Sequence, residues 1–129
     1  MFNHLLVIIG GGIGALLRYR VGMGVRSLMP GYDGLGTLIV NVAGSLAIGY
    51  WLGVSQDSKM VSESSRLFFV VGVLGGLTTF SSLVHETVLL ANHRDGGLSV
   101  GLGHITANVI LGLGAVWLGA WFSRSPSIT

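Results

Sequence analysis

The sequence predicts an all-α integral membrane protein with four transmembrane helices, the third of them broken. Half of the 129 residues are hydrophobic and only 9% are charged, whereas soluble domains contain roughly 25% charged residues. Four windows are apolar enough and, at about 20 residues or more, long enough to cross a bilayer. They cover residues 3–28, 34–54, 65–91 and 98–122. We expect these spans to form a single membrane domain over residues 1–129.

The first span contains an apolar run that we assign to the mature protein, because no basic segment precedes it as in a signal peptide. Within it, residues 10–15 match G-x-G-x-x-A. That motif binds dinucleotides only inside a strand–helix–strand unit, and a second membrane span follows here, so we exclude nucleotide binding. Arg18 follows residues 5–17, which are mostly apolar. It is either an interfacial anchor or a vestibule charge that attracts anions.

The second and fourth spans each contain a polar row. Thr37, Asn41 and Ser45 follow one another at intervals of four residues, which places them on one helix face. A buried Asn needs hydrogen-bond partners, so Asn41 either joins helices or donates to an anion. In the fourth span His104 and Asn108 have the same spacing, with Gly112 one turn further on, and could form a hydrogen-bonding track.

The third span contains Gly75-Gly76-Leu77-Thr78-Thr79-Phe80-Ser81-Ser82. Each glycine weakens a helix by about 1 kcal/mol relative to alanine. Broken membrane helices persist where protein or a watery cavity satisfies the backbone, and such breaks are common at ion and substrate sites. We therefore expect a break within residues 75–79 that forms a binding or permeation element.

Beyond this motif, Phe80, Leu83 and Thr87 share a helix face, with Glu86 beside them. Phenylalanine at helical spacing usually packs in a core, but its positive ring edge can also face an anion. Glu86 is the only acidic residue well inside a span. It is a functional residue by default, unless its side chain reaches the membrane interface near Ala91.

The remaining patterns concern packing and orientation. Small residues recur every four positions, at Gly10/Gly14, Ser45/Gly49/Gly53, Gly103/Ala107 and Ala115/Gly119, as expected where membrane helices approach closely. Basic residues are balanced between the two ends of the spans: Lys59, Arg66 and Arg124 against Arg18, Arg20, Arg26 and Arg94. The positive-inside rule therefore selects no orientation.

Composition excludes several classes of function. Cysteine is absent, so disulfides and thiolate sites are impossible. The formal charge of +2 is too small and dispersed for nucleic-acid binding. No metalloprotease motif, Cys/His cluster or carboxylate pair indicates catalysis, and we expect the protein not to be an enzyme.

Three motifs in order, residues 10–19, 36–45 and 75–82, resemble those of the Fluc (CrcB-type) fluoride channels. The resemblance covers the whole chain in length, number of spans and motif order. It implies an antiparallel, dual-topology homodimer with two fluoride pores and a sodium ion on the dimer axis. It also implies a prokaryotic inner-membrane location and passive export of fluoride from the cytoplasm, giving fluoride resistance.

The resemblance assigns roles residue by residue. The main-chain carbonyls of Gly75 and Thr78 match the sodium ligands, and Phe80 matches the first phenylalanine of the pore-lining pair. The other matches are Asn41, the donor beside Phe80; His104 and Asn108, in the polar track; and Glu86 and Arg18, a vestibule glutamate and the first-span arginine. Thr79 and Ser81 add hydroxyl donors along the pore.

The chain departs from the family at Leu83, where the pattern F-S-T-F would place a second phenylalanine. Two alternatives to a homodimeric channel therefore remain. One is an ion-coupled transporter of a small anion with Glu86 or His104 as proton carrier. The other is a non-conducting partner subunit that pairs with a homologous chain.

Overall fold

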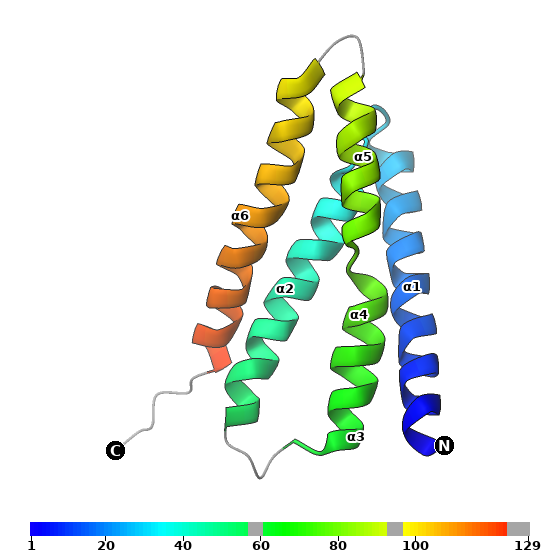
Figure 1. The fold of residues 1–129 in the computed structure, drawn as a ribbon, viewed down its shortest axis with the longest axis vertical. Helices are drawn as coiled ribbons and strands as arrows, with labels where there is room; N and C mark the ends of the chain where they lie inside the picture. Colours follow the sequence, from blue (N-terminus) through cyan, green and yellow to red (C-terminus); the bar gives the residue numbers. More distant parts are fainter. Residues whose placement is uncertain (57–60, 93–96, 124–129) are drawn as a thin grey trace.

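The computed structural model describes residues 1–56, 61–92 and 97–123. Their helices are α1 (Phe2–Leu28), α2 (Leu35–Gln56), α3 (Glu63–Ser65), the π-helical segment η1 (Arg66–Leu74), α4 (Gly75–Leu77), α5 (Phe80–Asn92) and α6 (Gly97–Ser123). Because α3, η1, α4 and α5 follow one another along one direction, they form one interrupted span (Figure 1). Within the described residues four spans are long and apolar enough to cross a membrane: α1, most of α2, the interrupted span and α6. The four-span all-α prediction is confirmed.

The interrupted span begins at a capped helix N-terminus. The Ser62 hydroxyl accepts a hydrogen bond from the Ser65 N–H at 3.1 Å, which satisfies one of the free amides of a helix N-terminus. Arg66 donates two hydrogen bonds to the carboxylate of Glu63, at 2.7 and 2.9 Å. Both side chains are exposed, so this pair contributes little to stability.

Close backbone contacts hold α1 against η1 and α4. A side chain at Gly10 or Gly14 would collide with the backbone of residues 68–77. The same holds between α2 and α6, where Gly49 and Gly119 meet the opposite backbone. These predicted small-residue rows therefore serve helix packing, as membrane helices associate through small residues. Gly103 has open space around it, so its row makes no such contact within one subunit.

The α1–α2 connection turns through glycines in the left-handed region. Gly31 and Gly34 both have φ of +91°, a conformation that glycine adopts without steric cost. Gly34 then lies so close to the imidazole of His104 that any side chain there would collide with the ring. The connection therefore covers one end of the α2–α6 packing.

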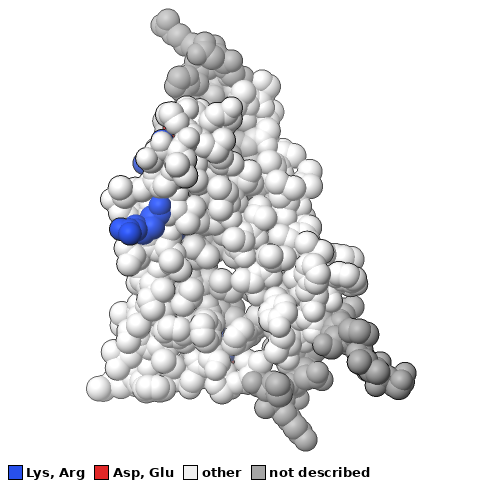
Figure 2. Space-filling view, turned by 180° about the vertical axis from the view of Figure 1, so that it is seen from behind, with Lys and Arg blue, Asp and Glu red and all other residues white. Residues whose placement is uncertain are grey.

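Most large apolar side chains point outward. Trp117 is 81% exposed and Ile8 67%, and the face in Figure 2 is uncharged apart from basic side chains near one margin. Such a surface suits lipid or a second subunit. Lys59, Arg94 and Arg124, which entered the predicted charge balance, lie outside the described residues.

Candidate functional site

The interrupted span opens at Thr78 and Thr79, as predicted, although Gly75 and Gly76 themselves remain helical. Thr78 is extended, with φ −81° and ψ 156°. The Thr79 hydroxyl then accepts a hydrogen bond from the Ser82 N–H at 3.2 Å, which makes Thr79 the N-cap of α5. The two threonines thus end one helix and begin the next.

Asn41 on α2 supplies hydrogen bonds that the helix backbone loses at the break. Its Oδ1 accepts the Thr79 N–H at 2.9 Å, a donor that a continuous α-helix would direct to the Gly75 carbonyl. Its Nδ2 donates to the Thr79 carbonyl at 3.1 Å and to Asn108 Oδ1 at 3.0 Å. Both amide hydrogens are therefore engaged within the subunit. This geometry favours the interhelical role of Asn41 over the anion donor.

The predicted track on α6 is continuous with this network. Asn108, only 5% exposed, donates its own amide to the His104 carbonyl at 3.0 Å. Gly112 faces Ser45 of α2. The polar row of α2 and the track of α6 therefore face each other across the α2–α6 packing.

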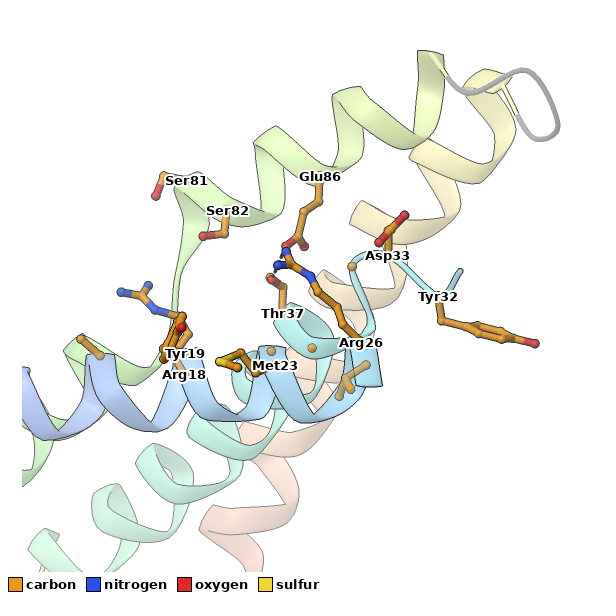
Figure 3. Close-up of a pocket in the computed structure, with 15 residues that line it drawn as sticks. Arg18, Tyr19, Met23, Arg26, Tyr32, Asp33, Thr37, Ser81, Ser82 and Glu86 are labelled. Atoms are coloured by element: carbon orange, nitrogen blue, oxygen red, sulfur yellow. Dashed lines mark hydrogen bonds between the residues drawn. The ribbon is translucent and has the colours of Figure 1, made fainter. Parts of the chain in front are cut away.

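A cavity of about 410 Å³ opens between α1, the start of α2 and α5 (Figure 3). We call it the charged cavity. Its polar lining residues are Arg18, Tyr19, Arg26, Tyr32, Asp33, Thr37, Ser81, Ser82 and Glu86. Arg18 also donates to the Thr78 carbonyl at 3.4 Å, so its guanidinium reaches the break. The vestibule role predicted for Arg18 fits this position better than an interfacial anchor.

A second cavity, of about 400 Å³, lies at the break, between α2 and the interrupted span. We call it the neutral cavity, because none of its described lining residues is charged. They are Asn41, Gly44, Ser45, Ile48, Val70, Leu74, Gly75, Thr78, Thr79, Phe80 and Leu83. Phe80 is 75% exposed, whereas Leu83 is 5% exposed. Both residues line the neutral cavity, but Phe80 is at the surface of the subunit and Leu83 is buried inside it.

The structure brings Glu86 and His104 together. Thr37 donates to Glu86 Oε1 at 2.9 Å, and His104 Nε2 lies 3.6 Å from Glu86 Oε2. The side chain of Glu86 is 19% exposed and that of His104 8%. Glu86 therefore points into the bundle toward α2 and α6, and the alternative that it reaches the interface near Ala91 does not hold within this subunit.

The sequence predicted one pore for nine residues, of which Arg18, Ser81 and Glu86 line the charged cavity. Arg26, Asp33 and Ser82 line it too, and sequence reasoning missed them. Arg26 follows Arg18 by eight residues, the spacing that identified the polar row of α2. That signal was available. The position of Asp33 follows from the path of the α1–α2 connection, which no spacing reveals.

The resemblance implies that the carbonyls of Gly75 and Thr78, both at the break, hold a sodium ion. Gly75 and Thr78 both line the neutral cavity, and the Thr79 N–H is diverted from the Gly75 carbonyl. Carbonyl oxygens suit a hard cation, so the residues fit the ion. Within one subunit Arg18 already donates to one of these two carbonyls, that of Thr78.

Comparison with known proteins identifies the family. Residues 5–120 match the family described as CrcB-like protein, Camphor Resistance (CrcB). The chain belongs to the CrcB family. The family inferred from the three motifs is thereby confirmed.

Several curated members of the CrcB family are similar along nearly their full length. Three of them have the name "Fluoride-specific ion channel FluC". The one from Solibacter usitatus is 41% identical over 95% of this chain and 98% of its own. The one from Hyphomonas neptunium is 41% identical over 96% and 97%. The one from Paramagnetospirillum magneticum is 42% identical over 92% and 93%.

Proposed function

We propose that this chain is the subunit of a fluoride-selective channel that lets fluoride leave the cytoplasm passively and so gives fluoride resistance. The observation on which the proposal rests is the similarity to relatives named as fluoride-specific channels, at about 40% identity over almost the whole chain. The two cavities beside the break support it. They place Arg18 and Arg26 at one cavity and neutral polar groups at the other.

The channel acts as an antiparallel homodimer in the prokaryotic inner membrane. Three observations support a second copy. The subunit encloses neither cavity, Phe80 in the lining of the neutral cavity is 75% exposed, and many large apolar side chains are exposed. A dimer axis near the break would also bring two pairs of Gly75 and Thr78 carbonyls together, which is the set of oxygens that a structural sodium ion needs.

Fluoride efflux from liposomes that contain only this chain tests the proposal. We expect a fast fluoride efflux that depends linearly on the gradient, and no chloride efflux above that of protein-free liposomes. Cross-linking in membranes should yield antiparallel dimers. Parallel dimers alone would overturn the topology without affecting the fluoride result.

One observation favours a second candidate, the ion-coupled transporter, because a carboxylate and an imidazole lie 3.6 Å apart inside the bundle. A transporter would saturate with fluoride, and a proton gradient alone would drive fluoride uphill. If this chain alone gives no fluoride flux but conducts when a homologous subunit is added, it is instead the partner subunit suggested by Leu83.

A further inference from the structure

Two buried polar atoms face each other without a hydrogen bond. Glu86 Oε2 and His104 Nε2 are both inaccessible and have no hydrogen-bond partner among the described residues. They lie 3.6 Å apart, about 0.5 Å beyond ordinary hydrogen-bond length. Buried polar atoms in proteins are almost always paired. A small approach of the two side chains would pair both at once.

We propose that Glu86 and His104 form a proton-binding site: the pair takes up one proton from water and so changes the charge beside the anion path. Without that proton the pair bears one negative charge, that of Glu86, inside the bundle. Uptake of the proton makes the pair neutral overall. A protonated imidazole donates from both ring nitrogens, so with the proton bound His104 Nε2 becomes a charged donor that faces the unpaired Glu86 Oε2.

The surroundings of the pair support this role. Thr37 of α2 donates to Glu86 Oε1 at 2.9 Å and so fixes the carboxylate with its other oxygen toward His104. Gly34 packs against the imidazole ring, which limits the access of water from that side. Glu86 itself lines the charged cavity, from which a proton can arrive.

Each element packed around the pair contributes charged or titratable groups. Helix α1 contributes Arg18 and Arg26, and the α1–α2 connection contributes Asp33; all three line the charged cavity with Glu86. Tyr19 and Tyr32 line the same cavity. The titratable residue of α2 is Tyr50, thirteen residues beyond Thr37 and so toward the opposite end of that helix, and in α6 His104 is the only one. On α5 the neighbour is His85, which is exposed. The charged cavity and its pair thus sum to zero before proton uptake and to plus one after it.

Fluoride passage should therefore depend on pH, a consequence that rests on the proposed fluoride conduction. We expect efflux, corrected for protein-free liposomes, to rise between about pH 8 and about pH 5.5, the interval in which histidine changes charge. One unit of charge near the cavity predicts a rise of roughly threefold to tenfold at moderate ionic strength. His104→Gln should flatten the profile, and His85→Gln, the matched control, should preserve it.

The proton site is tested without fluoride by following the imidazole signals of ¹⁵N-histidine-labelled protein in nanodiscs during a pH titration, with His104 assigned from the His104→Gln variant. If the two groups share the proton, Glu86→Gln should shift the midpoint of the His104 signals, whereas an isolated imidazole would keep it. Thr37→Val should shift the midpoint less, and Thr37→Ser should restore it.

A midpoint that stays within about 0.3 pH units in Glu86→Gln would overturn the proposal, whether or not the protein conducts. If the midpoint shifts but no fluoride flux exists, the proton site stands and the proposed function fails. If the variants misfold, the test uses the parent protein alone. A His104 signal that changes over a different pH interval from the infrared band of the carboxylate then contradicts a shared site.

Discussion

The charged cavity and the neutral cavity have nearly equal volumes, about 410 and 400 Å³, but they differ in the groups that line them. Arg18, Arg26, Asp33 and Glu86 line the first, whereas amides, hydroxyls, carbonyls and apolar side chains line the second. Arg18, whose guanidinium reaches the break, can attract an anion to that point. Neutral donors replace water around an ion without binding it so tightly that it cannot leave. The difference suggests that collecting an anion and dehydrating it occur in separate places.

A fixed negative charge in the neutral cavity should have the largest effect on fluoride efflux. In Ser45→Asp, burial of an unpaired carboxylate costs several kcal/mol, and the carboxylate also repels an anion. We expect initial fluoride efflux to fall by about 100-fold or more, since 2.7 kcal/mol corresponds to that factor. Ser45→Asn, which has nearly the same shape and no charge, is the control. Equal efflux from both variants would place the anion path outside this cavity.

Removal of sodium tests whether the neutral cavity is neutral in the working protein. If the Gly75 and Thr78 carbonyls hold a structural sodium ion, prolonged dialysis against a large organic cation should abolish most of the fluoride efflux. Restored sodium should return it. The rates are measured in liposomes at matched ionic strength. Unchanged flux after exhaustive removal would show that the break needs no cation.

The two apolar side chains of the neutral cavity should differ in importance. Phe80→Leu removes the only aromatic edge among the described lining residues, so we expect about a tenfold loss of efflux, which corresponds to about 1.4 kcal/mol. Leu83→Phe should increase efflux by about twofold, because a second ring can extend into the cavity. Efflux that is lower in Leu83→Phe would mean that the buried position cannot accept the larger side chain.

The smallest effect concerns the charged cavity. Arg26→Gln should lower efflux by roughly twofold to threefold at low salt, and the difference should vanish near 1 M salt, where the Debye length is about 3 Å. Arg20→Gln, on the same helix but outside the cavity lining, is the matched control. A difference that persists at high salt would indicate a direct contact in place of long-range attraction.

The sequence predicted the four spans to within two residues at each end, because apolar runs and turn residues mark them directly. It also predicted the break, from the two glycines that weaken a helix, but Gly75 and Gly76 remain helical and the span opens after them, at Thr78. It gave no sign of the π-helical geometry of η1, which depends on how the backbone packs against α1. The periodicity of α2 identified the polar row, but not that Asn41 would use both amide hydrogens inside the subunit.

The pairing of Glu86 with His104 also lay beyond sequence reasoning. Both residues were singled out separately, but their distance depends on the relative register of α5 and α6, which the intervening residues do not determine. Leu83 shows the same limit. Its position in the motif marked a missing ring, whereas its burial could be found only once α5 was placed among its neighbours.

The threonine break also changes the electrostatics of the backbone. A continuous helix would present its dipole only at the two membrane surfaces, with roughly half a unit charge of each sign. Because α4 ends at Leu77 and α5 begins at Phe80, opposite poles lie inside the bundle (Figure 1). The positive pole lies beside Ser81 and Ser82, at the charged cavity, and the negative pole beside the carbonyls of the neutral cavity. Two uncharged residues thereby create one location that favours an anion and another that favours a cation.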